Sequence, residues 1–399
     1  TGIGNTIKDN NFMKIIPYAK QDISNADIDA VVKVLRSEML TQGPMVPRFE
    51  EAIAKYSGSK YTIAMNSATS ALHVACMALD LGSGDWLWTS ANTYVASSNC
   101  ALYCNASVEF IDIDPCTYNI CVDSLEQKLK KARHLGCLPK ILIPVHYAGQ
   151  SCDMVKIHSL SKEYGFRIVE DASHAIGGKY HNEAVGACRY SDITIFSFHP
   201  VKIITTGEGG AALTNDSKLA NLMSQFRSHG ITSEQNQMSI RPKNEIWNYQ
   251  QIRLGYNYRM TDIQAALGLS QLNRIDQYIK KRNSIAEFYW QHLTDLPIQL
   301  PVRLEDTLSS FHLYILKIKE SSQKSRNDLY QHLLDNQIGV NLHYIPIYRH
   351  PAYQELGFQK GYCYEAEQYF QNALSIPIYP GLSEESMLKI VTSIKSFFE

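Results

Sequence analysis

Short apolar runs alternate with helical stretches between residues 61 and 226, and this alternation leaves few folds open to the chain. The apolar runs cover 61–65, 85–90, 108–113, 140–146, 166–171 and 193–198. The helical stretches between them lie near 67–79, 95–104, 122–134 and 154–164. Repeated strand–helix units build a mostly parallel sheet with helices on both faces. We therefore predict an α/β fold with functional residues beyond the carboxyl ends of the strands.

Helical signals also precede this region. Ser24 with Asp27 three positions later is a capping-box pattern with Asp in place of Glu, and helical apolar spacing follows it. A second helix is expected over 49–56, ended by Gly58. Residues 1–12 have neither the basic start nor the apolar stretch of a signal peptide. We interpret them as an expression scar ahead of a native start at Met13.

The region after Thr261 has a different pattern. We expect one long helix from 261 to about 293, and after it a strand over 312–318, a helix over 326–336 and a strand over 340–344. This pattern predicts a smaller α+β domain over 261–399, joined to a large domain over 13–260.

Charge and cysteine content exclude several classes of protein. The formal net charge of -1 gives no basic field that would attract nucleic acid or a membrane surface. No apolar run approaches the roughly 20 residues of a membrane helix. The nine cysteines include no CxxC pair, which argues against a disulfide framework and a structural zinc site. We expect reduced thiols in a cytoplasmic protein without a metal.

Lys202 stands in the segment SFHPVKIITTGEGG, between the end of an expected strand and a glycine cluster. A lysine becomes a Schiff-base nucleophile when partial desolvation or nearby positive charge lowers its pKa. The glycines permit tight turns and close approach of the backbone. An ordinary solvated surface lysine remains the alternative.

The segment VEDASHA ends another expected strand with an acidic pair, and His174 follows Asp171 by three positions. A carboxylate here could keep the pyridine nitrogen of pyridoxal phosphate (PLP) protonated, with His174 as a donor near the ring hydroxyl. A helix N-cap at Asp171 is equally compatible with this segment.

The segments MNSATSALH and ANTYVAS follow two further strands. Free N–H groups at a helix start, together with Ser and Thr hydroxyls, form an anion site, although plain N-capping by Ser67 explains the same pattern. Ser197 offers another hydroxyl. Tyr94 could stack on an aromatic ring, or it could simply pack against its neighbours.

Taken in order, these segments resemble the DegT/DnrJ/EryC1/StrS family of sugar aminotransferases. The matching motifs are NSATSAL (66–72), TYVAS (93–97), EDASHA (170–175), SFHPVK (197–202) with GEGG (207–210), and LGYNYRMTDIQAALG (254–268). Five ordered motifs make the resemblance specific, and it extends from Tyr18 to the end of the chain. It implies the type I fold of PLP-dependent aminotransferases. A branch of the family that dehydrates its substrate carries histidine where this chain keeps Lys202, so the resemblance favours transamination.

The resemblance also implies roles for individual residues. Lys202 would be the Schiff-base lysine and proton shuttle, Asp171 would pair with the pyridine nitrogen, and His174 would lie near the ring oxygen. The remaining cofactor contacts would come from Tyr94 on the ring and from Ala68, Thr69 and Ser197 on the phosphate. Asn257 would reach the phosphate from a neighbouring subunit, which implies a homodimer. Turn chemistry before the next helix is the alternative for Asn257.

Within the family, the stretches LTQG, VHYAGQS, FRSHG, GLSQL and GVNLHYIPIY are most similar to PseC-type enzymes of pseudaminic acid biosynthesis. The implied substrates are UDP-2-acetamido-2,6-dideoxy-β-L-arabino-hexos-4-ulose and L-glutamate. The residues expected to line the sugar–nucleotide site are Tyr18, Thr41, His343, Tyr344 and Tyr348. Core packing is the alternative for these tyrosines, because 24 tyrosines cannot all be functional.

Other functions remain open from the sequence. The substrate could be another nucleotide-linked 4-keto-6-deoxy sugar, such as the D-xylo UDP-HexNAc epimer or a dTDP- or GDP-sugar. The chain could also be a PLP-binding regulator without turnover, although Lys202 and Asp171 are intact. A nucleotide-dependent oxidoreductase is disfavoured because no GxGxxG follows an early strand.

Overall fold

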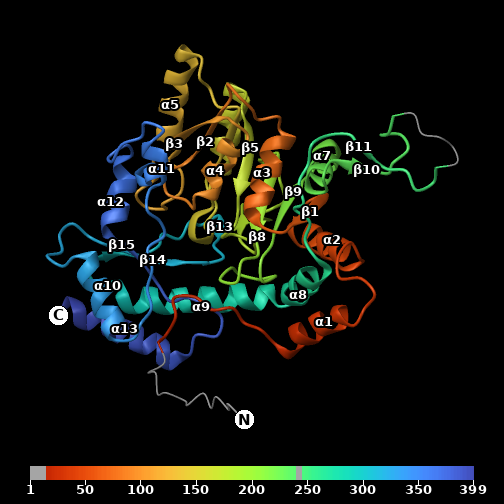
Figure 1. The fold of residues 1–399 in the computed structure, drawn as a ribbon. Helices are drawn as coiled ribbons and strands as arrows, with labels where there is room; N and C mark the ends of the chain where they lie inside the picture. The colour runs from red at the N-terminus through yellow and green to blue at the C-terminus, as the bar shows by residue number, and fades with distance from the viewer. Residues whose placement is uncertain (1–14, 240–244) are drawn as a thin grey trace, which may run out of the picture.

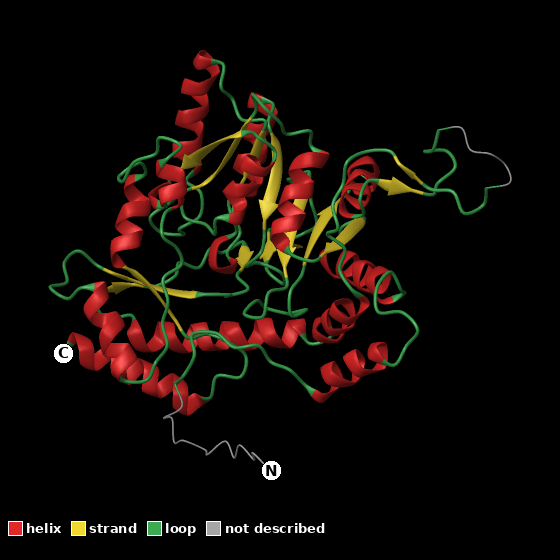
Figure 2. Ribbon diagram, viewed as in Figure 1, coloured by secondary structure: helices red, strands yellow, loops and turns green. Residues whose placement is uncertain are grey.

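A seven-stranded sheet forms the centre of the molecule (Figures 1 and 2). The computed structural model describes residues 15–239 and 245–399. In spatial order the strands are β1 (Tyr61–Met65), β9 (Gly210–Thr214), β8 (Ile193–Ser197), β5 (Arg167–Asp171), β4 (Ile141–Ile143), β2 (Trp86–Ser90) and β3 (Ser107–Ile111). The strands from β8 to β3 run parallel, and β9 pairs antiparallel with both β8 and β1. The α/β expectation is confirmed.

Both faces of this sheet are covered, which explains the continuous apolar runs in the sequence. Alternate residues of a strand point to opposite faces. Ile141 and Ile143 accordingly pack into one core with α3 (Ala68–Ala78), α4 (Ala96–Tyr103) and α7 (Ser217–Arg227). Leu142 packs on the other face with α5 (Val122–Leu135) and α6 (Met154–Tyr164). A strand buried on both faces needs apolar side chains at every position.

The first two helices lie beside the sheet, below β1 in Figure 1. The capping box expected at Ser24 opens α1 (Asn25–Leu35), and Gly58 ends α2 (Met45–Ser57) with a φ of +79°. However, α2 begins four residues before the expected start. Its first N–H groups, including those of Met45 and Val46, are hydrogen-bonded by the carboxylate of Asp262, more than 200 positions away in the sequence.

The expected single helix over 261–293 is wrong, because the chain forms two helices there. These are α8 (Asp262–Leu272) and α9 (Ile275–Leu293). They have different partners: α8 packs against α1 and α2, whereas α9 crosses to α13 (Glu384–Phe398). Arg274, at the turn between them, is held by the buried carboxylate of Asp27, with Nη2 to Oδ2 at 2.6 Å.

A second, antiparallel sheet lies in the C-terminal part. It comprises β12 (Ile298–Gln299), β14 (Tyr314–Ile318) and β15 (Ala373–Ile376), packed with α9, α10 (Arg326–Asp335) and α13. The strand expected over 340–344 is wrong, because this stretch makes only an isolated bridge between Asn341 and Ser375. The remaining helices there are α11 (Pro351–Gln354) and α12 (Tyr364–Asn372).

The expected division near residue 260 stays a prediction. Tyr353 and Tyr369 belong to the C-terminal half of the chain, yet their side chains are buried in the same core as the large sheet.

The described structure also contains two small antiparallel sheets. One pairs β10 (Ile231–Thr232) with β11 (Gln250–Gln251), and the other comprises β6 (Lys179–Tyr180), β7 (Glu183–Ala184) and β13 (Thr307–Leu308). Across residues 15–239 and 245–399, no helix combines the length and apolar character needed to cross a membrane.

Candidate active site

The carboxyl ends of β5 and β8 bring the predicted catalytic residues to one edge of the sheet. Asp171 ends β5 and Ser197 ends β8, and the two strands are parallel neighbours. Lys202 follows Ser197 by five positions. Because parallel strands end at the same edge, residues more than 30 positions apart meet there.

Asp171 is buried, with 5% of its surface exposed, and its carboxylate is held from two sides. The hydroxyl of Ser97 donates to Oδ2 at 2.6 Å, and the backbone N–H of Ser173 donates to Oδ1 at 3.1 Å. A turn rather than a helix follows Asp171, so the N-cap alternative is wrong. The two donors thus fix the orientation of the carboxylate.

Lys202 is partly buried, and its environment makes the amine more available as a nucleophile. Burial lowers the pKa of Lys202 to about 8, although the negative charge of Asp171 acts in the opposite direction. An ordinary lysine has a pKa near 10.4, so its neutral form is scarce at neutral pH. The lowered pKa distinguishes Lys202 from a solvated surface lysine and suits Schiff-base chemistry.

Three histidines surround this lysine, and all are held neutral. Burial, with the charge of Lys202 as the next cause, keeps the pKa values of His174 and His312 well below their usual range and lowers that of His343 to about 3. The Nδ1 atom of His174 accepts the N–H of Ala148 at 3.2 Å. The proton of His174 therefore sits on Nε2, 3.0 Å from the hydroxyl of Tyr344, and this nitrogen is a donor.

The start of α3 presents free backbone donors at the same edge. The Ser67 side chain caps the helix by accepting the N–H of Ser70 at 3.1 Å. The N–H groups of Ala68 and Thr69 lie in the first turn, where no intrahelical acceptor exists. A Cβ on Gly210 would lie 2.4 Å from the nitrogen of Ala68, so only glycine lets β9 run this close to the helix start. N-capping by Ser67 leaves these two N–H groups available, so it is compatible with the predicted anion site.

These groups fit PLP. A carboxylate can hold the proton of a pyridine nitrogen, a lysine of lowered pKa can bind an aldehyde, and a helix start with hydroxyls can bind a phosphate. Ser197, at the end of β8, adds a buried hydroxyl.

Of the predicted ring-stacking and substrate residues, Tyr94, Tyr18, His343 and Tyr344 lie together near His174 at this edge. Tyr94 is 59% exposed, and its ring centroid is 6.1 Å from that of Tyr344. The ring centroids of Tyr18 and His343 are 5.4 Å apart. Thr41 bridges to Thr261, and Asn257 is exposed beside the β10–β11 hairpin.

Tyr348 does not lie with these residues. Its side chain is fully buried against the ring of Phe110 in the main core, and its hydroxyl lies 3.1 Å from both the carbonyl oxygen of Cys363 and the carboxylate of Glu367. The structure does not bring Tyr348 to the site, and core packing, the alternative weighed for the tyrosines, describes it.

Two residues of the site were missed from the sequence. Ser97 binds Asp171, and its only signal was its position three residues after Tyr94 in the TYVAS motif. His312 lies at the start of the segment expected as a strand, and its ring centroid is 4.4 Å from that of His174. An isolated histidine beside an apolar run gives no sign of such a neighbour.

Comparisons with known proteins find relatives that match nearly the whole chain. The chain matches the DegT/DnrJ/EryC1/StrS aminotransferase family over residues 21–395. It is 37% identical over 388 residues to the UDP-4-amino-4,6-dideoxy-N-acetyl-beta-L-altrosamine transaminase of Campylobacter jejuni, covering 96% of this chain and 98% of that protein.

Solved structures of sugar aminotransferases have the same fold as this chain. PseC from Helicobacter pylori, an aminotransferase involved in the biosynthesis of pseudoaminic acid, superposes with a TM-score of 0.88 at 32% identity, over 96% of this chain and 99% of that one. The PLP form of the sugar aminotransferase Spr1654 from Streptococcus pneumoniae gives a TM-score of 0.85 at 30% identity, with 96% and 98% coverage. The expected fold, that of the PLP-dependent aminotransferases, is confirmed.

Proposed function

Because this chain belongs to the DegT/DnrJ/EryC1/StrS aminotransferase family, we propose that it aminates the C4 ketone of UDP-2-acetamido-2,6-dideoxy-β-L-arabino-hexos-4-ulose. L-Glutamate is the amino donor. The products are UDP-4-amino-4,6-dideoxy-N-acetyl-β-L-altrosamine and 2-oxoglutarate, which places the enzyme in pseudaminic acid biosynthesis. The names of the Campylobacter and Helicobacter relatives support this substrate.

The observation that carries the proposal is the pairing of Lys202 with Asp171 at one sheet edge. PLP, when bound, supplies an electron sink for the carbon that gains or loses the amino group. Asp171 would hold the proton on the pyridine nitrogen, because its carboxylate is buried and fixed by Ser97. The N–H groups of Ala68 and Thr69, with the hydroxyl of Ser197, would bind the phosphate.

Lys202 is the proposed proton carrier. With its pKa lowered to about 8, a substantial fraction of the amine is neutral near pH 7.5 and can accept a proton from a carbon acid. It would take the proton from one carbon and return it to the other, between sugar C4 and the carbon of the cofactor aldehyde. His174 stays neutral with its proton on Nε2, so it would donate a hydrogen bond without adding charge beside Lys202.

The proposed sugar–nucleotide site is formed by Tyr18, Thr41, His343 and Tyr344. His343 is anchored by Ser375, with Nδ1 to Oγ at 2.8 Å. The backbone N–H of Tyr344 donates to Oδ1 of Asn92 at 3.0 Å. Tyrosine and neutral histidine suit an uncharged sugar, because they combine an apolar ring with a hydrogen-bonding group.

We further propose a cytoplasmic homodimer in which Asn257 of one subunit completes the site of the other. Asn257 is exposed and does not contact Lys202 within one chain, and the β10–β11 hairpin beside it projects from the body of the molecule (Figure 1). The exposed apolar side chains of Ile246 and Trp247 in this arm favour burial against a second subunit. The nine cysteines are free thiols, in keeping with a reducing compartment.

Spectroscopy tests the proposal. The purified protein supplied with PLP should gain an absorbance band that shifts when L-glutamate is added, with release of 2-oxoglutarate. A protein that remains colourless after PLP is supplied would overturn the proposal. A band that glutamate leaves unchanged would also contradict the proposed amino donor.

A further inference from the structure

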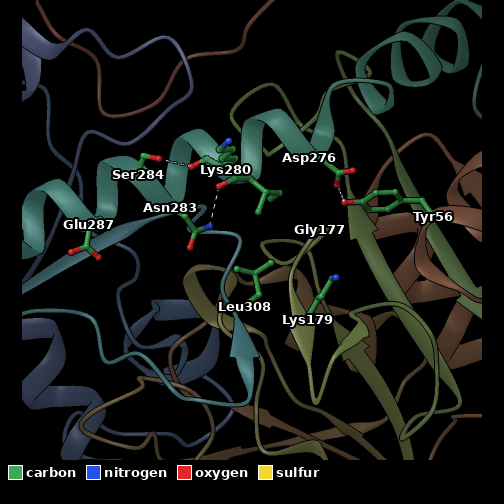
Figure 3. A pocket seen from close by; sticks show the side chains of 10 residues that line it. Tyr56, Gly177, Lys179, Asp276, Lys280, Asn283, Ser284, Glu287 and Leu308 are labelled. Carbon is green, nitrogen blue, oxygen red and sulfur yellow. Dashed lines mark hydrogen bonds between the residues drawn. The ribbon is translucent and has the colours of Figure 1, made fainter.

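A cleft lies along α9, away from Lys202. Its volume is about 710 Å³, which is within the usual range of small-molecule sites. Lys280 and Asn283 of α9 form one wall, and Lys179 of β6 and Leu308 of β13 form the other. Figure 3 shows Lys179 and Leu308 facing α9 across the cleft, with Tyr56 at one end. None of the proposed PLP or sugar residues lines it.

The cleft carries two uncommitted positive charges. Among the described residues, neither Lys179 nor Lys280 has a hydrogen-bond or ion-pair partner for its ammonium group. Of the two carboxylates of the cleft, Glu287 has a cationic partner, whereas Asp276 has only a neutral hydrogen-bond donor and keeps its charge. Asp276 accepts the hydroxyl of Tyr56 at 2.8 Å. Glu287 is paired with Arg303, and the side-chain amide of Gln291 also donates to it.

The rest of the lining suits the body of a small organic molecule. Ile279 is buried against Gly177, and Leu308 closes the opposite wall. Lys179 and Lys280 both line the cleft, and ammonium groups bind phosphate as point charges. A phosphorylated metabolite therefore matches the cleft better than a neutral sugar.

Both walls of the cleft are connected through the chain and through hydrogen bonds to the backbone of His174. Lys179 follows His174 by five positions and pairs directly with Leu308 in the small sheet. On the α9 side, the amide of Asn283 donates to the carbonyl of Ser309 at 3.0 Å. The hydroxyl of the next residue, Ser310, donates to the carbonyl of His174 at 2.6 Å. An occupant that moves either wall therefore moves a backbone segment attached to His174.

We propose that this cleft is a regulatory site for a phosphate-bearing small molecule, and that its occupancy changes turnover through His174. The site is separate from the proposed transamination site. Its binding test needs no sugar substrate, so failure of one proposal is distinguishable from failure of the other.

Calorimetry on the PLP-loaded enzyme with inorganic pyrophosphate as the probe tests the binding. The wild type should bind one more pyrophosphate per chain than the double variant K179Q/K280Q does. In the double variant, the affinity of the cleft for pyrophosphate should fall at least about tenfold. The matched control K389Q/K395Q removes two exposed lysines of α13 and should bind as the wild type does. Any pyrophosphate held at the nucleotide site is common to all three proteins.

The proposal would be overturned if the wild type and K179Q/K280Q bound the same number of pyrophosphate molecules per chain. It would also be overturned if K389Q/K395Q lost as much pyrophosphate binding as K179Q/K280Q does.

The regulatory part of the proposal has its own test. Pyrophosphate should change kcat or the KM for glutamate in the wild type, and this change should be absent in K179Q/K280Q. Binding at the cleft with unchanged kinetics would overturn the link to His174.

Discussion

At the scale of single residues, the site depends on groups whose ionisation the fold has set. Lys202 is kept partly neutral by burial, and His174 is kept neutral. The carboxylate of Asp171 is held in position by the hydrogen bonds from Ser97 and Ser173. The sequence could predict that Lys202 and Asp171 lie at one edge of the sheet, because each stands at or shortly after the end of a strand in a distinctive motif. The contribution of Ser97 could not, because nothing local links it to a carboxylate 74 positions later.

Replacing Lys202 with Ala should abolish turnover. The variant loses both the amine that binds the cofactor and the proton carrier, so kcat should fall by at least about 10³-fold. PLP should still bind, because the phosphate cradle and Asp171 remain. Steady-state kinetics and the absorbance of the bound cofactor check this, with Lys389→Ala as the control. Near-normal turnover would show that Lys202 is not the catalytic lysine.

The pKa of Lys202 predicts a pH dependence for cofactor capture. Only the neutral amine attacks the PLP aldehyde, so the rate at which apoenzyme takes up PLP should rise through about pH 8 and level off above it. Stopped-flow absorbance between pH 6 and about 10 measures this. A rate that continues to rise up to pH 10, as for a solvated lysine, would contradict the lowered pKa.

Replacing Ser97 with Ala should weaken the cofactor site without unfolding the protein. The change removes a 2.6 Å hydrogen bond to a charged carboxylate, worth about 1.5–3 kcal/mol, and PLP affinity should fall about 10- to 100-fold. Ser98→Ala is the matched control, because the neighbouring hydroxyl contacts Tyr353 instead. Equal effects of the two substitutions on PLP affinity would argue against a role for Ser97 at Asp171.

At the scale of elements, prediction succeeded where the signal is local. The strand at 61–65 and the helix at 154–164 have the expected bounds, because an apolar pattern and clear end signals define them. Prediction failed where contacts between residues far apart in the sequence determine where a helix begins or ends. The helix over 261–293 divides because its halves have different packing partners, and α2 begins early because Asp262 binds its first N–H groups.

Asp262 should therefore stabilise α2 across the sequence. Asp262→Ala removes the acceptor for three N–H groups, and we expect a loss of about 1–3 kcal/mol, seen as a lower midpoint of thermal unfolding. The control is Asp123→Ala in the first turn of α5, where the side chain is exposed and makes no cap hydrogen bond. If both variants unfold at the wild-type temperature, the long-range cap contributes nothing.

At the scale of the whole molecule, the sequence predicted the α/β architecture but not how the C-terminal half packs. The core that covers one face of the large sheet includes Tyr348, Tyr353 and Tyr369, all from beyond residue 340. Periodicity indicates that a side chain is buried, but it does not indicate which core buries it. The family resemblance implied a place for Tyr348 in the substrate site, and no local pattern could assign it to this core instead.

Shared sites in a homodimer predict complementation. Asn257→Ala and Lys202→Ala should each be inactive or nearly so as pure proteins. Mixed dimers contain one site with both Lys202 and Asn257 intact, so activity should appear after subunits are exchanged. Activity assays before and after mixing measure this. Mixtures that stay as inactive as their components, with exchange verified by mass spectrometry, would rule out a shared site.

The central claim is tested most directly by an amination assay with the two C5 epimers side by side. L-Glutamate is supplied with either the L-arabino or the D-xylo UDP-4-keto-6-deoxy-HexNAc, and the amino sugar is detected by mass spectrometry. We predict product from the L-arabino epimer only. Product from the D-xylo epimer only would keep the aminotransferase mechanism but contradict the proposed place in pseudaminic acid biosynthesis.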